Sequence, residues 1–255
     1  MSGRILLLRS GSAGPEEEAP APDVTPLQTH AIEPVPAGIA EALAFDPAGA
    51  VLVVSSKVAA RVLLPLFPLR FSLVIAVGEG TGDLLRRVNT GEGGAGRPGG
   101  PSTYSGAGGT QIVVPTVPGA AGVIDFLRGS SAPRSSRILW PHGSDAASSP
   151  FEEIRLLGFS LVAPVVYAKR ALRPSELDAA VLADFVAGRF GSVAVGSTAG
   201  LGVLLSAVPS PPPVRWGVLG PETAKAVAAR GLPTPVVPPR ARLADLLDLL
   251  RKETT

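Results

Sequence analysis

Small polar residues follow short apolar runs at four points of this sequence. They are Ser55 and Ser56, Gly78 and Thr81, Ser197 and Thr198, and Gly220 and Thr223. Each place is typical of a strand that ends at the N-terminus of a helix, where backbone N–H groups and the helix dipole attract anions. Four such helix starts around one cleft would suit a ligand with many carboxylates. The two halves of the chain carry these pairs at nearly the same spacing, which indicates an internal repeat.

Other kinds of chemistry are excluded by residue type. The sequence contains no cysteine and only two histidines, His30 and His142. The lack of cysteine excludes disulfides, thiolate zinc sites and cysteine nucleophiles. Two imidazoles cannot form a histidine-rich metal site, so we expect no metal. Neither a pair of catalytic carboxylates nor a Ser/His/Asp set stands out.

A glycine-rich stretch contains one nucleotide-binding pattern. Residues Gly91–Gly96 match the string G-x-G-x-x-G, but they follow a helix-like stretch and not a strand. We therefore interpret Gly91–Gly109 as a mobile surface loop.

The charge balance limits the class of partner. The net charge is +2, charged residues make up 17% of the chain, and no block of lysine and arginine interleaves with aromatic residues. This composition argues against nucleic-acid binding and allows a small anionic ligand. The apolar run Ile5–Leu8 is stopped by Arg9 and is too short for a signal peptide or a membrane span. We expect a soluble cytoplasmic protein with no membrane partner.

The elements that must position these residues alternate between two patterns. Short continuous apolar runs, typical of strands buried on both faces of a parallel sheet, are separated by helical patterns. This alternation predicts an α/β fold with parallel sheets. Among the predicted elements are a strand over Leu161–Val166, a strand over Pro235–Val237 and a helix over Pro174–Val186.

Two extended, proline-punctuated segments, His30–Pro36 and Val162–Arg170, look like crossings between domains. If they pair, the chain forms a discontinuous α/β domain (1–34 plus 169–255) and an inserted α/β domain (35–168). A two-stranded linker would join the domains beside an interdomain cleft.

An ordered series of motifs resembles the uroporphyrinogen-III synthase family over almost the whole chain. Leu219-Gly220-Pro221-Glu222-Thr223-Ala224 is similar to the family's "I-G-P-x-T-A". The other motifs are Ile5–Arg9 (opening strand and arginine), Val53–Ser56 (strand end), Ala76–Gly78 with Thr81 ("V-G-x-x-T"), and Gly158–Val162 with Val166, Tyr167 and Arg170 (return strand). The order and spacing of these motifs, with the discontinuous domain plan, carry the resemblance.

The resemblance implies a cofactor-independent lyase of tetrapyrrole (haem) biosynthesis. Its substrate would be hydroxymethylbilane, a linear tetrapyrrole with many carboxylates. Loss of the terminal hydroxyl as water, attack by the far pyrrole ring and a spiro intermediate would invert ring D and close the type III macrocycle. The enzyme's main task would be to hold one folded geometry. The family also suggests a monomer and a transient contact with the upstream deaminase.

Site residues follow from the same resemblance. We expect the substrate carboxylates to bind Ser55, Ser56, Gly78, Thr81, Ser197, Thr198, Gly220, Thr223 and Arg9. Tyr167 is the candidate catalytic residue, because a phenol could donate a hydrogen bond to the departing hydroxyl.

Each residue also has a plainer interpretation. Serine and threonine cap helices in every class of protein. Tyr167 could be a packing residue, and Arg9 could neutralise a helix C-terminus. We expect His142 in an ordinary surface loop, Trp140 and Trp216 in the core, and 16–18 in a solvated loop.

Alternative functions stay open at this point. Val195-Gly196 and the segment Arg137–Asp145 depart from the family pattern. They motivate a non-catalytic, diverged homologue that binds a tetrapyrrole or a protein partner. A second alternative is a hinged small-anion binding protein, and a third, a nicotinamide enzyme, depends only on the glycine run.

Overall fold

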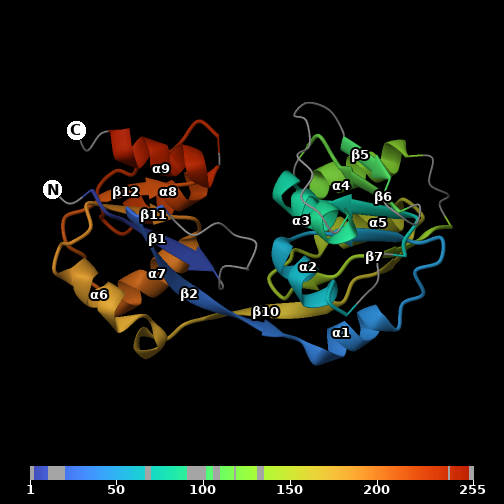
Figure 1. The fold of residues 1–255 in the computed structure, drawn as a ribbon, viewed down its shortest axis with the longest axis horizontal. Helices are drawn as coiled ribbons and strands as arrows, with labels where there is room; N and C mark the ends of the chain where they lie inside the picture. The colour runs from blue at the N-terminus through green and yellow to red at the C-terminus, as the bar shows by residue number, and fades with distance from the viewer. Residues whose placement is uncertain are drawn as a thin grey trace. The chain divides into compact units, whose positions relative to one another are not determined.

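A computed structural model describes residues 3–10, 21–66, 70–90, 102–105, 110–117, 119–130, 135–240 and 242–252. The chain divides into two compact units. The first unit comprises Met1–Ile32 and Lys169–Thr255, and the second comprises Glu33–Ala168. The predicted α/β class with two sheets is confirmed, and Figure 1 shows the elements of each unit.

The first sheet has the strand order β12-β11-β1-β2-β10-β8. Its strands are β1 (Ile5–Ser10), β2 (Val24–Pro34), β8 (His142–Gly143), β10 (Val165–Ala171), β11 (Ser192–Val195) and β12 (Arg215–Val218). The strands β12, β11, β1 and β2 are neighbours in that order, and each neighbouring pair runs parallel. The Val35 amide donates to Val166 O and the Leu172 amide to Thr29 O, so β2 and β10 run in opposite directions. The chain passes from one unit to the other along these two strands.

Helices cover both faces of the parallel part of this sheet. Leu6 and Leu8 pack with α6 (Ala179–Val186), α7 (Thr198–Ala207) and α8 (Pro221–Ala228). Ile5 and Leu7 point to the opposite face, where they pack with Leu246 and Leu250 of α9 (Leu243–Lys252). Successive residues of a strand point to opposite faces, so a strand covered on both sides must be apolar throughout.

The second sheet has the order β5-β6-β4-β3-β7-β9. Its strands are β3 (Val51–Val54), β4 (Leu73–Ala76), β5 (Ser102–Ser105), β6 (Gln111–Val114), β7 (Arg137–Leu139) and β9 (Ser160–Val162). All neighbours are parallel except β5, which is antiparallel to β6.

The helices of the second unit are α1 (Pro36–Leu43), α2 (Lys57–Leu63), α3 (Glu79–Thr90), α4 (Ala120–Gly129) and α5 (Ser149–Leu156). Val51 and Val53 of β3 face a core formed with α4 and α5. Leu52 and Val54 face the side of α2. The two faces of β3 are therefore both buried, as its continuous apolar sequence predicts.

Several predicted elements differ from the structure. The run Leu161–Val166 is split into β9 and β10, because Pro164 has no N–H to donate within a strand. The helix over Pro174–Val186 is a 3₁₀ turn, η1 (Pro174–Glu176), followed by α6. Leu177 follows the turn, and Asp178 then caps α6 by accepting from the amides of Ala180 and Val181.

Two further predictions need correction. The region of Pro235–Val237 contributes only an isolated bridge between Val236 and Gly217. The segment interpreted as a mobile loop, Gly91–Gly109, contains β5; its remaining residues, with the G-x-G-x-x-G string, lie outside the described part. Residues 16–18 also lie outside it.

Trp140 and Trp216 are buried, which confirms their predicted core positions. In the described part of the chain, no helix has the length and apolar character needed to cross a membrane.

Candidate functional site

Ser55 and Ser56 form the turn between β3 and α2 in the second unit. Ser56 has an extended backbone (φ −157°, ψ 155°), and its Oγ accepts from the Ala59 amide at 3.0 Å. This contact satisfies one of the amides that a helix start leaves without an internal partner. Ser55 Oγ donates to Pro141 O at 3.4 Å. The turn is therefore fixed both to its own helix and to the segment after β7.

The neighbouring turn, between β4 and α3, contains Gly78 and Thr81. The Val77 amide donates to Val54 O at 3.1 Å, so the ends of β3 and β4 lie side by side. The Thr81 amide donates to Gly78 O at 3.0 Å, and Thr81 is buried in the first turn of α3. The structure thus brings both predicted turns of this unit to one edge of the second sheet.

Lys57 is a residue at this edge that the sequence reasoning missed. Its Cε lies 2.9 Å and its Nζ 3.4 Å from the place where a Cβ on Gly80 would be. The side chain therefore runs from the first residue of α2 to the first turn of α3 and places a cation beside both helix starts. The signal in the sequence was a lysine directly after the capping serine, which a charge-poor composition makes conspicuous.

The first unit repeats the same construction. Ser197 has an extended backbone (φ −154°, ψ 151°) and its Oγ accepts from the Gly200 amide at 3.2 Å, as the cap of α7. The Leu219 amide donates to Val195 O at 3.3 Å, which aligns the ends of β11 and β12. This contact corresponds to the one between Val77 and Val54. The internal repeat seen in the sequence is a repeat of local geometry.

The remaining predicted residues of the first unit lie around these ends. Gly220 is the residue before α8 (φ −162°, ψ 169°), with Pro221 in the first turn and Thr223 buried behind it. Thr198 is exposed at the first position of α7, and Arg9 is half-buried near the end of β1. The structure brings Ser197, Thr198, Gly220 and Thr223 to the carboxyl ends of β11 and β12.

Thr29 and His30 form a buried polar pair that the sequence reasoning also missed. Thr29 Oγ1 donates its single proton to Arg9 O at 2.8 Å. The contact between Thr29 Oγ1 and His30 Nδ1, at 3.0 Å, is then a bond in which Nδ1–H donates. Thr29 Oγ1 also lies 3.3 Å from the position of a Cβ on Gly200, so the pair lies against the first turn of α7.

Tyr167 lies on β10 and is only 4% exposed. Its hydroxyl is 3.2 Å from Ser56 Oγ, and either oxygen can donate. The structure therefore joins the candidate catalytic residue to a predicted binding residue in the same unit. Burial of the ring with its polar end on a helix cap is the arrangement expected for a tyrosine whose hydroxyl needs a partner.

The expectation that His142 lies in a surface loop is wrong. His142 is buried in β8, with Nδ1 2.8 Å from Gly143 O and Nε2 3.1 Å from Ala163 O. Its ring lies 4.7 Å, centroid to centroid, from the ring of Phe151. Pairing of β8 with β10 buries this segment, and a pairing between distant segments leaves no local sequence signal.

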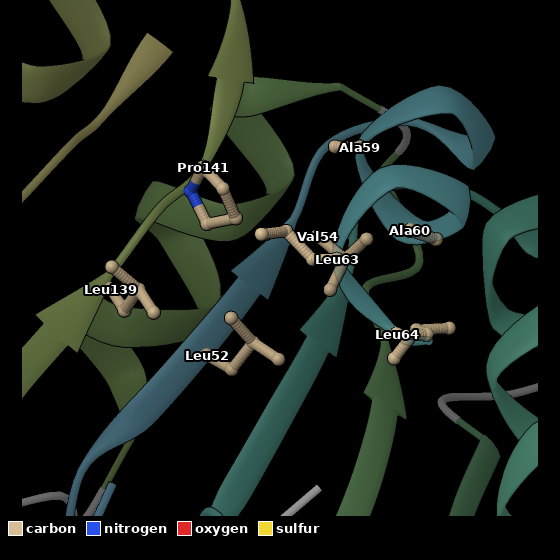
Figure 2. A pocket seen from close by; sticks show the side chains of 8 residues that line it. All are labelled: Leu52, Val54, Ala59, Ala60, Leu63, Leu64, Leu139 and Pro141. Carbon is tan, nitrogen blue, oxygen red and sulfur yellow. The ribbon is translucent and has the colours of Figure 1, made fainter. Parts of the chain in front are cut away.

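An apolar pocket lies under the Ser55–Ser56 turn, between α2 and the strands β3 and β7. The empty space among its lining residues, part of it open to solvent, is about 290 Å³. Figure 2 shows its lining: Leu52, Val54, Ala59, Ala60, Leu63, Leu64, Leu139 and Pro141. These side chains offer no hydrogen-bonding group to a carboxylate. The side chains that line the pocket therefore add no polar contact to the candidate site.

The carboxyl groups whose pKa is lowered, Asp23, Asp46 and Glu176, are not among the predicted site residues. Arg170 donates to Glu176 and holds the pKa of that carboxyl below its ordinary value. The amide of Ala48, and then Arg137, lower the pKa of Asp46. Among the described residues, no group of three or more His, Cys, Asp or Glu side chains could hold a metal ion.

These features define a class: an α/β protein of two units, each with neighbouring parallel strands that end at helix N-termini, one of them capped by a serine. A family model of uroporphyrinogen-III synthase HemD matches residues 16–248. The chain therefore belongs to the uroporphyrinogen-III synthase HemD family.

One solved structure, with a TM-score above 0.5, supports the fold. The chain is 15% identical to uroporphyrinogen-III synthetase from Helicobacter pylori, with a TM-score of 0.61 and 98% of each chain covered. A mutant uroporphyrinogen III synthase from Thermus thermophilus is 16% identical, with a TM-score of 0.47, over 90% of this chain and 89% of that one. A comparison with curated proteins found no match.

Proposed function

We propose that this protein is an active uroporphyrinogen-III synthase. In this reaction hydroxymethylbilane loses its terminal hydroxyl, which leaves as water and creates an azafulvene-like cation. The substituted carbon of the far pyrrole attacks that cation and gives a spiro intermediate, which fragments and closes again with ring D inverted. Membership of the family carries the proposal, and the geometry of the turns supports it.

The capped helix starts supply what a polycarboxylate needs. Free amides of the first turn and the helix dipole attract carboxylates. In the second unit, Lys57 adds a cation beside the starts of α2 and α3. We assign the substrate carboxylates to the turns at Ser55, Ser56, Gly78 and Thr81, and at Ser197, Thr198, Gly220 and Thr223, with Arg9 as a further contact. Capping and binding are compatible, because a cap uses only one of the amides of the first turn.

Tyr167 is the group that we assign to proton chemistry. Its hydroxyl bonds Ser56 Oγ, which accepts from the Ala59 amide and can donate its own proton to the phenol oxygen. A phenol so placed can donate to the departing hydroxyl of the bilane and assist loss of water. Without enzyme the bilane closes to the type I isomer, so the protein must above all hold one orientation of the far ring.

One experiment tests the activity directly. Hydroxymethylbilane is generated in place by its upstream deaminase, this protein is added, and the products are oxidised and separated as uroporphyrin isomers. We expect predominantly type III product. Only type I product, with active deaminase and folded protein, would refute the proposal.

The second candidate is a non-catalytic member of the family. Val195 and Gly196, at the end of β11, depart from the family pattern and directly precede the cap of α7. Bilane binding measured by titration calorimetry, without type III product, would favour this candidate. Absence of both binding and product would favour a protein for another small anion.

A further inference from the structure

The ring of Tyr167 occupies space that only a glycine leaves open. A Cβ built on Gly143 would lie 2.6 Å from Cζ and 2.7 Å from Cε2 of Tyr167. Carbon atoms in contact are normally about 3.5–4.0 Å apart. Because Tyr167 is almost fully buried, its ring has little room to give way. Gly143 therefore forms one wall of the site that holds the ring.

The backbone fixes Gly143 and Tyr167 relative to each other. The two residues are partners in the β8–β10 pairing, and the Ser144 amide donates to Tyr167 O at 2.9 Å. The His142 amide donates to Pro164 O at 3.0 Å, one step earlier along the same pair of strands. A shift of one strand could relieve the clash of a side chain at position 143 only by breaking these hydrogen bonds.

The His142 side chain holds the same segment from a second direction. Both of its ring nitrogens face carbonyl oxygens, of Gly143 and of Ala163, and a carbonyl can only accept. A neutral imidazole carries one N–H, so the ring donates to one of these two carbonyls, and the tautomer decides which. Nδ1 lies against the peptide of Gly143 and Nε2 against the chain that leads into β10, so either tautomer bonds the ring to a backbone carbonyl of this region. The ring is also packed against Phe151, which limits its rotation.

We infer that His142 and Gly143 are positioning residues for Tyr167: together they set the direction in which its hydroxyl points toward Ser56. This inference rests on the proposed function, because it gives the residues that hold the Tyr167 ring a role in turnover. Neither residue needs to touch the substrate. The segment that contains them is also where the sequence departs from the family pattern. In this chain, therefore, Tyr167 is supported by a segment that differs from that pattern.

The position of the Tyr167 ring can be measured without any activity assay. Tyr104 is the only other tyrosine of the sequence. A Tyr104→Phe protein labelled with 3-fluorotyrosine gives one ¹⁹F resonance, which reports the surroundings of Tyr167. Gly143→Ala is made in this background. Gly129→Ala is the matched control, because a Cβ at 129 meets nothing within 4 Å.

We expect Gly143→Ala to move or split the ¹⁹F resonance and Gly129→Ala to leave it in place. In unlabelled protein, Gly143→Ala should lower the rate of type III formation about 100-fold, since small misplacements of a reacting group cost this much. An unmoved resonance would overturn the inference. A moved resonance with an unchanged type III rate would overturn the positioning role and leave the proposed function standing.

A second pair of variants keeps the test decisive if Gly143→Ala does not fold. His142→Phe keeps a ring against Phe151 and removes the imidazole N–H, whereas His142→Gln keeps a side-chain amide donor. We expect His142→Phe to move the resonance and lower type III formation, with partial rescue by His142→Gln. Equal behaviour of both variants and wild type would contradict the inference. Wild-type protein with no type III product would refute the proposed function instead, whatever the resonance shows.

Discussion

The hydroxyl of Tyr167 lies 3.2 Å from Oγ of Ser56, although 111 positions separate the two residues in the chain. The contact joins strand β10 to the cap of α2, and Ser56 is at the same time bonded to the Ala59 amide. A helix cap that also holds a buried phenol links the stability of a turn to the placement of a reactive group. The two roles can be separated by substitution.

Tyr167→Phe removes the phenol oxygen and keeps the ring against Gly143. We expect a loss of about 1 kcal/mol in the free energy of unfolding, the usual worth of one hydrogen bond. The rate of type III formation should fall about 100-fold or more, as for loss of a general acid. The isomer assay and urea unfolding measure the two effects. Tyr104→Phe serves as the control, and a wild-type rate in Tyr167→Phe would remove the catalytic assignment.

Ser197→Ala separates capping from substrate binding. Loss of a serine cap typically costs about 1 kcal/mol of stability. Asp178→Ala removes the cap of α6, which is outside the candidate site, and should cost a similar amount. We expect only Ser197→Ala to raise the KM for hydroxymethylbilane as well. If both variants lose stability and neither changes the KM, Ser197 is a cap and nothing more.

Much of this fold could be predicted because its signals are local. The runs Val51–Val54 and Ser192–Val195 are apolar at nearly every position, since both faces of each strand are covered. Ser56 and Ser197 mark helix starts because a side-chain oxygen must accept from an amide of the first turn. Local rules of this kind identify strand ends and caps from a single sequence.

The features that escaped prediction depend on contacts between distant segments. Strand β5 lies beside glycine-rich sequence, and its pairing with β6 has no apolar signature. His142 is buried because two-residue strand β8 pairs with β10. Lys57 reaches the start of α3 only because β3 and β4 end side by side. None of these relationships follows from neighbouring residues.

Two glycines of α4 should respond oppositely to alanine. A Cβ on Gly122 would overlap the carbonyl oxygen of Val117, whereas a Cβ on Gly129 meets nothing within 4 Å. We expect Gly122→Ala to lower the free energy of unfolding by about 1–3 kcal/mol, the range for overpacking. Gly129→Ala should leave it unchanged or raise it by a few tenths, since alanine favours helix. Equal effects in urea unfolding would show that α4 can shift away from Val117.

The ion pair between Asp23 and Arg251 ties α9 to the start of β2. Nε of Arg251 lies 2.8 Å from Oδ2 of Asp23, and Nη2 lies 3.0 Å from Oδ1. This bidentate hydrogen bonding lowers the pKa of Asp23 below its ordinary value of 3.8. Both side chains are more than a third exposed, so solvent screens the pair and we expect it to contribute only about 1 kcal/mol.

The direction of the pKa shift fixes the pH dependence. Because the folded pKa of Asp23 is below the unfolded one, the unfolded chain binds more protons as pH falls. The contribution is complete well above pH 3.8 and is lost as pH falls through the lower, folded pKa. Asp23→Asn should therefore be less stable than wild type at pH 7. The difference in the free energy of unfolding should shrink as the pH falls below 3.8, the ordinary pKa of the carboxyl. A double-mutant cycle with Arg251→Gln, followed by urea unfolding at each pH, isolates the pair. A coupling free energy that stays constant down to pH values where wild-type Asp23 is protonated would contradict this assignment.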